Sequence, residues 1–262
     1  MNKREVEKKK LPSLAELVSL NKKRALITGS GAGIGKAIAY RFAEADADLE
    51  LVDINELSLN TVKKELENLF DVEINIYKVD LSKKEEIDRL WKKLEGKEPD
   101  ILINNAGIYP IKPFLDTDEA FLEKVMNINL NSVFWMCQHM IKSRIKKGGV
   151  IINMGSIEAI LPFKEDLCHY DISKAGVMVF TRALASEYGT RGFRINVLVP
   201  GGIMTPGTKS MAKEVLKLNM GIIKSGIEYS MRTPREDWEN QTKSHAWHWF
   251  LQVTYQATYM EH

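Results

Sequence analysis

Six short apolar runs alternate with longer amphipathic stretches along the chain, and this alternation restricts the folds open to it. We predict strands over 24–28, 48–53, 73–79, 100–104, 150–155 and 193–199, with helices near 33–45, 55–70, 82–95, 117–145 and 168–189. Runs such as ALIT, DILIN and VIINM are apolar almost throughout, as in strands that helices cover on both faces. We therefore expect an α/β fold of the Rossmann type, in which a doubly wound parallel sheet forms a single domain.

No repeat or low-complexity tract divides the 262 residues. We predict an N-terminal arm with some helix over 1–22 and one domain over 23–262. A glycine- and proline-rich segment at 201–235 is a candidate lid over a site at the carboxyl ends of the strands.

Composition excludes several classes of function. The 37 basic and 35 acidic residues are well mixed, and no apolar run approaches the ~18 residues of a membrane span. We expect a cytoplasmic protein that binds neither nucleic acid nor membrane. The two cysteines form no CxxC pair, and His245 and His248 have no further ligand nearby, so neither a disulfide framework nor a metal site is predicted.

A glycine-rich turn, TGSGAGIG at 28–35, follows the first predicted strand and opens the first helix. Gly29, Gly33 and Gly35 leave space for a pyrophosphate, and the helix N-terminus directs N–H groups toward it. The second strand ends at Asp53, whose carboxylate can accept hydrogen bonds from an adenosine ribose and repels a 2′-phosphate. We interpret this pattern as an NAD(H) site, although a plain turn and an aspartate capping the next helix are the alternatives.

Tyr170 and Lys174 lie four residues apart in a predicted helix, so their side chains project from one face. A phenol has a reference pKa of about 10, and a nearby ammonium lowers that pKa toward the range useful for acid–base catalysis. An ordinary surface pair is the alternative. If the glycine turn binds a nicotinamide cofactor, the pair indicates a dehydrogenase.

Taken in order, these motifs resemble those of the short-chain dehydrogenase/reductase family over roughly residues 20–260. The matching positions are TGSGAGIG at 28–35, Val79-Asp80-Leu81, Asn104-Asn105-Ala106-Gly107, Asn129, Ser156, Tyr170 with Lys174, and PGGIMT at 200–205. The resemblance implies that NAD(H) is held by Gly29, Gly33, Ile34, Gly35, Asp53, Asp80, Leu81, Asn105, Ala106, Gly107, Tyr170, Lys174, Pro200, Gly201, Ile203 and Thr205.

The same resemblance implies a catalytic set. Tyr170 would exchange a proton with the oxygen of a secondary alcohol or ketone, and Ser156 would hydrogen-bond that oxygen. Lys174 would bind the nicotinamide ribose, and Asn129 would anchor a water that links Lys174 to solvent. Single structural roles, such as a strand-end serine or an asparagine at a helix bend, are the alternatives for each residue taken alone.

The stretch between Ser156 and Tyr170 resembles that of sugar dehydrogenases of the family in Glu158, in a proline beside an aromatic residue, and in His169. We therefore expect Glu158 and His169 to contact a sugar or polyol substrate. The alternatives are that Glu158 faces solvent and His169 only packs. At the level of function, the alternatives are a 3-oxoacyl-thioester (acyl-carrier-protein) reductase and a non-catalytic NAD-binding scaffold or sensor.

Family members usually end with a seventh strand and an Asp-Gly-Gly segment, whereas this chain stops at ATYMEH over 257–262. We expect the last strand to be missing through truncation, a frameshift or an altered chain end such as a tag remnant. Many relatives form tetramers partly through this region, so its loss would expose a sheet edge and weaken assembly. A homo-oligomer, either tetramer or dimer, is still predicted.

Overall fold

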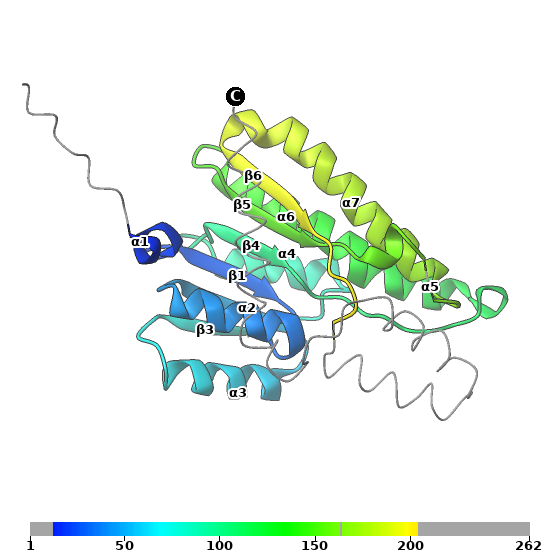
Figure 1. Cartoon of the computed structure of the whole chain (residues 1–262), viewed down its shortest axis with the longest axis horizontal. Coiled ribbons are helices and arrows are strands. Elements are labelled where there is room, and N and C mark those ends of the chain that lie inside the picture. The colour runs from blue at the N-terminus through cyan, green and yellow to red at the C-terminus, as the bar shows by residue number, and fades with distance from the viewer. Residues whose placement is uncertain (1–12, 163, 204–262) are drawn as a thin grey trace, which may run out of the picture.

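The structure is a computed structural model that describes residues 13–162 and 164–203 (Figure 1). The strands are β1 (Arg24–Thr28), β2 (Asp48–Asp53), β3 (Ile74–Lys78), β4 (Ile101–Asn104), β5 (Gly149–Met154) and β6 (Phe193–Leu198). The helices are α1 (Leu14–Val18), α2 (Gly33–Glu44), α3 (Glu56–Glu67), α4 (Lys84–Lys93), α5 (Glu119–Met126), α6 (Ser132–Arg144) and α7 (Cys168–Tyr188). Most of the predicted lid, Thr205 and the chain end, where the usual seventh strand was expected to be missing, lie outside the described residues.

The six strands form one parallel sheet in the order β3-β2-β1-β4-β5-β6. This order confirms the predicted doubly wound Rossmann-type fold. The chain moves outward from β1 to β3, returns through α4, and continues from β4 to β6 on the other side of β1. In sheets of this kind, ligands bind at the carboxyl ends of the strands beside such a reversal, here between β1 and β4, and we call this position the crevice.

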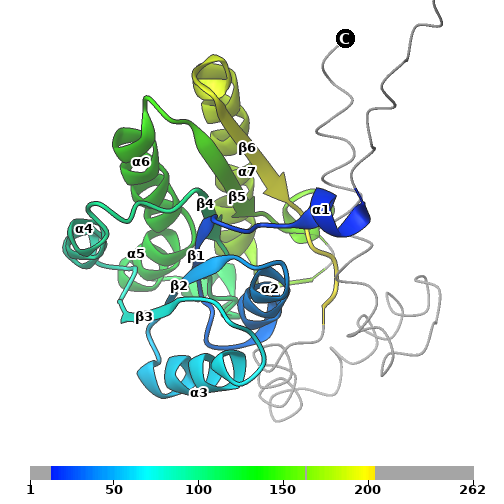
Figure 2. The same cartoon turned by 90° about the vertical axis from the view of Figure 1, so that its left-hand side faces the viewer.

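Two apolar cores cover the two faces of the sheet (Figure 2). Along β1, Leu26 packs into the core under α4, α6 and α7, whereas Ala25 and Ile27 pack into the core under α2 and α3. All three side chains are fully buried. Alternation of direction along a strand therefore places apolar side chains in both cores, which explains why β1 is apolar without interruption.

The helix predicted over 117–145 is interrupted in the structure. α5 ends at Met126, a π-helical turn covers Asn127–Asn131, and α6 begins at Ser132. The fully buried Asn129 lies in this turn, with its side-chain amide bonded to the backbone of Ile108. Periodicity does not reveal such a bulge because it inserts only one extra residue into an otherwise helical pattern.

The predicted N-terminal helix is short in the described residues. α1 has five residues, and its start is fixed by a capping box in which Ser13 and Glu16 bond each other's backbone N–H groups. Leu14 and Leu17 remain exposed on it.

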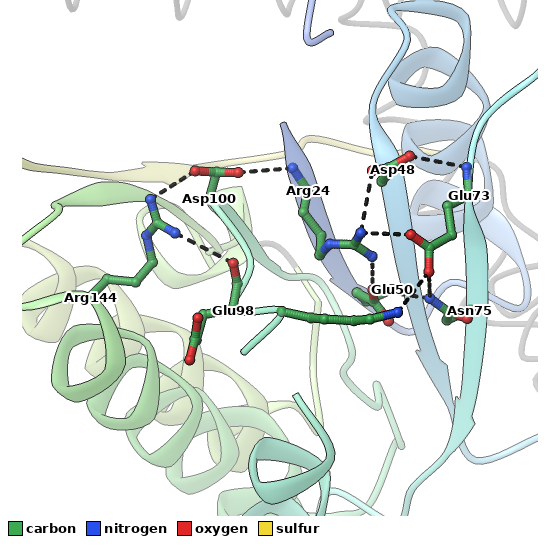
Figure 3. A network of polar contacts seen from close by, with 9 residues as sticks. Arg24, Asp48, Glu50, Glu73, Asn75, Glu98, Asp100 and Arg144 are labelled. Carbon is green, nitrogen blue, oxygen red and sulfur yellow. Dashed lines mark hydrogen bonds and ion pairs between the residues drawn. The ribbon is translucent and has the colours of Figure 1, made fainter. Parts of the chain in front are cut away.

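A network of charged side chains joins the amino ends of the strands, at the edge opposite the crevice (Figure 3). The Arg24 guanidinium pairs with Asp48, with Glu73 at 2.7 Å and with Glu50, whose side chain is fully buried. The backbone N–H of Arg24 also donates to Asp100, which connects the network to β4. Arg24 is therefore the counter-ion that allows Glu50 to be buried within the sheet.

We predict that Arg24→Met lowers the free energy of unfolding by about 3–5 kcal/mol, because it leaves the buried Glu50 carboxylate without its cation. The double variant Arg24→Met/Glu50→Met should be more stable than the single variant, since no orphan charge remains. Denaturant unfolding measures both. Arg89→Met is the control, because Arg89 is 67% exposed and its pair with Glu86 spans 3.8 Å. If the single and double variants were equally destabilised, the role given to Arg24 would be wrong.

Candidate active site

The first wall of the crevice is the turn between β1 and α2. Thr28 Oγ1 accepts hydrogen bonds from the backbone N–H groups of Asn105 and Ala106, each at 3.0 Å. The Asn105 amide donates back to the carbonyls of Thr28 and Gly29. A Cβ on Gly35 would lie 2.1 Å from the Gly29 carbonyl, and Gly29 itself has φ +65°. The turn thus keeps a bare backbone surface at the start of α2, with Gly33 and Ile34 in its first turn, and this suits a pyrophosphate.

Asp53 lies against this turn at the end of β2. Its Oδ2 accepts from the backbone N–H of Gly31 at 2.9 Å, and its Oδ1 accepts from that of Asn55 at 2.9 Å. The N-cap of α3 is Asn55, whose side chain accepts from the Ser58 N–H. Asp53 is therefore not the cap, and its carboxylate faces the glycine turn.

Asp80 and Leu81 follow β3 at the same edge of the sheet. Asp80 Oδ1 accepts from the N–H and the hydroxyl of Ser82, at 3.0 and 2.6 Å. The Ser82 hydroxyl is the main reason that the pKa of Asp80 lies below its usual value. Leu81 is buried at 8% exposure. The carboxylate is thus held in its charged form beside the crevice.

Asn129 connects three segments of the site. Its Oδ1 accepts from the Ile108 N–H at 2.8 Å, and its Nδ2 donates to the Ile108 carbonyl and to Ser173 Oγ. A Cβ on Gly107 would lie 3.2 Å from this Oδ1 and 3.4 Å from Lys174 Nζ. Asn129 therefore ties the segment after β4 to α7, close to the buried Lys174.

Ser156 and Tyr170 meet at the carboxyl end of β5. Tyr170 lies in the first turn of α7, and its ring is perpendicular to that of Tyr109, with centroids 4.5 Å apart. Burial raises the pKa of Tyr170, and hydrogen bonding with the Ser156 hydroxyl opposes this effect. Burial and the nearby carboxylates of Asp171 and Glu158 together outweigh that hydrogen bond, so the shift is opposite in direction to the lowered pKa that the sequence predicted.

Lys174 follows Tyr170 by one helical turn in α7. Its Nζ donates to the Met154 carbonyl at 2.8 Å and lies 5.9 Å from the centroid of the Tyr170 ring. Burial lowers the pKa of Lys174 to about 8. Near neutral pH the ammonium is therefore poised close to its titration, and the structure brings it beside Tyr170 as predicted.

Two carboxylates, those of Asp171 and Glu158, lie close enough to Tyr170 to raise its pKa. Glu158 is 1% exposed, and its Oε1 accepts from the Lys164 N–H at 2.8 Å. Burial and Glu158 together raise the pKa of Asp171 to about 6. The Lys164 ammonium lies over the Tyr109 ring at 5.4 Å. The sequence reasoning missed Tyr109, Lys164 and Asp171, although Tyr109 closely follows the NNAG motif and Asp171 adjoins Tyr170.

His169 points away from these groups. Its Nε2 lies 2.8 Å from the Pro110 carbonyl, and its ring meets the edge of Phe121 at 4.8 Å. It is 4% exposed. His169 therefore joins α7 to α5 and to the segment after β4, an arrangement that matches the packing alternative rather than direct contact with a substrate.

The segment after β6 lies beside the turn that carries Ser156. The Pro200 carbonyl accepts from the Ile157 N–H at 3.0 Å, which joins this segment to the turn that carries Ser156. Gly201 is exposed, and Ile203 is 45% exposed. Thr205, predicted at the same site, lies outside the described residues.

Within residues 13–162 and 164–203, no group of three or more His, Cys, Asp or Glu side chains could hold a metal ion. No helix in that part of the chain is long and apolar enough to cross a membrane.

Comparison with known proteins agrees with this geometry. The short chain dehydrogenase family profile matches residues 23–216. The 3beta-hydroxysteroid dehydrogenase 2 of Eggerthella lenta is 33% identical over 72% of this chain and 77% of its own length. The glucose 1-dehydrogenase of Gluconobacter oxydans is 36% identical over 70% of each chain.

A solved structure shows the same arrangement. L-Sorbose reductase from Gluconobacter frateurii, in complex with NADPH and L-sorbose, matches with a TM-score of 0.73 and 30% identity over 78% of each chain. The matching profile covers most of the chain, and the relatives share at least 30% identity over more than two thirds of it. The chain therefore belongs to the short-chain dehydrogenase/reductase family and is an oxidoreductase.

Proposed function

We propose that the protein transfers a hydride between NAD(H) and a secondary alcohol or ketone, with a sugar or polyol as the substrate class. The observation that carries this proposal is the partly buried Tyr170, which adjoins Ser156 and lies beside Lys174 on the same helix face. The bound dinucleotide supplies the hydride acceptor or donor. The chain supplies the proton chemistry and the orientation of the substrate.

Tyr170 is the proposed general acid and base. In oxidation its phenolate takes the proton of the alcohol hydroxyl, and in reduction its phenol returns a proton to the forming alkoxide. Ser156 donates a hydrogen bond to the same oxygen, where charge changes most during the reaction. Lys174 would bind the nicotinamide ribose, and Asn129 would anchor a water that links Lys174 to solvent for the return of protons.

The preference for NAD(H) rests on Asp53. Its carboxylate lies at the glycine turn, where it would accept hydrogen bonds from the adenosine ribose and repel a 2′-phosphate. Asp80, Leu81, Asn105, Ala106 and Gly107 line the proposed path of the dinucleotide toward Lys174. Pro200, Gly201, Ile203 and Thr205 are the proposed contacts of its nicotinamide end.

The substrate class rests on the polar wall around Tyr170. Carboxylates such as Glu158 and Asp171 accept hydrogen bonds from neighbouring hydroxyl groups of a sugar or polyol, and an aromatic ring such as Tyr109 packs against its carbon face. The relatives that act on glucose and sorbose support the same class. We propose Glu158 as a substrate contact and His169 as the residue that positions the segment after β4.

A 3-oxoacyl-thioester reductase is the second candidate, and a Chlamydia muridarum enzyme of that name is 32% identical over 72% of this chain. That activity generally uses NADPH, and the Asp53 carboxylate at the glycine turn disfavours a 2′-phosphate. A non-catalytic NAD-binding scaffold would have no use for Ser156, Tyr170 and Lys174 in this arrangement.

We also propose a cytoplasmic homo-oligomer, either dimer or tetramer. Leu122 and Phe134 are each 40% exposed on α5 and α6, and Ile172 and Val179 are more than half exposed on α7. Helices α5, α6 and α7 lie on the same side of the sheet, so a second copy would cover these apolar side chains (Figure 1). Sedimentation of the purified chain as a monomer would contradict this proposal.

A substrate panel with both cofactors tests the proposed function. Sugars, polyols, simple alcohols and 3-oxoacyl thioesters are offered with NAD(H) and NADP(H) in parallel, and absorbance at the reduced nicotinamide band reports turnover. We expect the highest kcat/KM with NAD and a polyol or sugar. A strong preference for NADP would contradict the role of Asp53, and binding of NADH without any turnover would favour the scaffold.

Tyr170→Phe should lower kcat by about 10²- to 10⁴-fold, because it removes the exchangeable proton and keeps the ring. NADH affinity, measured by fluorescence titration, should stay within about twofold of wild type. Tyr109→Phe is the matched control, since it removes a neighbouring phenol whose oxygen has no proposed proton role. Unchanged kcat in Tyr170→Phe, or an equal loss in both variants, would refute the mechanism.

Lys174→Met should stabilise the protein near neutral pH while impairing turnover. The pKa of Lys174 is about 8 in the folded protein and 10.5 in its reference state, so burying the cation costs free energy below about pH 8. The unfolded chain binds more protons between these two values, and wild-type stability should therefore rise with pH across them relative to the variant.

Denaturant unfolding at pH 7 and pH 10 checks this expectation. The variant should exceed wild type by about 1–3 kcal/mol at pH 7, and the difference should shrink at pH 10. Lys93→Met on α4 is the control, because Lys93 is exposed. A variant that is less stable than wild type by the same amount at both pH values would contradict the burial cost.

A further inference from the structure

A surface cavity of about 600 Å³ lies directly beyond Asp53. It is lined by Ile54, Asn55, Glu56, Leu57, Asn60 and Lys78. Asp53 and Lys78 are register partners at the last paired position of β2 and β3, so the cavity opens at the same edge of the sheet as the proposed dinucleotide site. The adenosine end of a dinucleotide whose ribose is held by Asp53 would reach this cavity.

Lys78 is the one cation among the residues that line the cavity. A cation at this place is expected in a site that binds the 2′-phosphate of NADP(H). Lys78 would therefore oppose the preference for NAD(H) that Asp53 sets. In the structure Lys78 Nζ pairs with Glu56 Oε2 at 3.8 Å, and the two side chains are 62% and 59% exposed. The negative charge of Glu56 therefore offsets the positive charge of Lys78 at the mouth of the cavity.

We infer that Glu56 is a second determinant of cofactor preference, which acts by neutralising Lys78 so that the cavity does not attract the 2′-phosphate of NADP(H). This inference rests on the proposed dinucleotide site. The lining itself has one acidic and one basic side chain, Glu56 and Lys78, and Asp53 lies next to it in the chain, so carboxylates outnumber the ammonium at this place. Removing the charge of Glu56 leaves the Lys78 ammonium without this ion pair. The ammonium can then offset the charge of Asp53 and bind a phosphate.

Fluorescence titration of NADPH and NADH against Glu56→Gln tests the inference without a substrate. We expect the Kd for NADPH to fall about three- to tenfold, a modest change because the pair is exposed, while the Kd for NADH stays within about twofold. The gain should shrink when NaCl rises from 50 to 300 mM, since screening weakens exposed charges.

Two further variants show where the gain comes from. Glu56→Gln/Lys78→Gln should lose the gain, because the freed cation is gone. Glu67→Gln is the matched control, since it breaks another exposed pair of α3, that of Glu67 with Lys63 at 3.5 Å, and changes net charge equally away from the cavity. An unchanged Kd for NADPH in Glu56→Gln, an equal gain in Glu67→Gln, or a gain that persists in the double variant would overturn the inference.

The titration also separates this inference from the proposed function. If the wild-type chain bound neither dinucleotide, both would be wrong. If it bound NADH but Glu56→Gln left NADPH binding unchanged, only the role of Glu56 would be overturned.

Discussion

The hydroxyl of Thr28 holds together the two strands between which the chain reverses direction. It accepts the N–H groups of Asn105 and Ala106, and it donates to the Ile103 carbonyl at 3.3 Å. These bonds fix the end of β1 against the end of β4 and align Gly29 with the segment after β4. The glycine turn and the NNAG segment, which supply several of the proposed contacts with the dinucleotide, form the two sides of this junction.

The site is a compromise between stability and chemistry. At the edge of the sheet opposite the crevice, the buried carboxylate of Glu50 is paired with the Arg24 guanidinium. At the crevice, by contrast, Lys174 is buried with a carbonyl as its partner, and the half-buried Tyr170 lies near carboxylates that disfavour its phenolate. Groups with displaced pKa values are typical of functional sites, since a general acid or base must titrate near the working pH.

Much of this arrangement could be predicted because several site residues directly follow a predicted strand. Continuous apolar runs mark buried parallel strands, so residues such as Asp53 and Ser156 could be placed at one edge of the sheet before any coordinates. The π-helical turn at Asn129 could not be predicted, nor could the raised pKa of Tyr170. Both depend on contacts between residues distant in sequence and on burial, which periodicity does not encode. The pairing of Lys78 with Glu56 was missed for the same reason.

In the proposed reaction, a hydride leaves the carbinol carbon of the substrate while Tyr170 accepts the proton of its hydroxyl group. The most direct measurement uses a polyol substrate with deuterium at the reacting carbon and mass spectrometry of the reduced nicotinamide product. We expect that NADH formed by the wild-type protein carries one deuterium, and that Tyr170→Phe forms almost no labelled NADH. NADH without deuterium, or equal formation of labelled NADH by Tyr170→Phe, would contradict it.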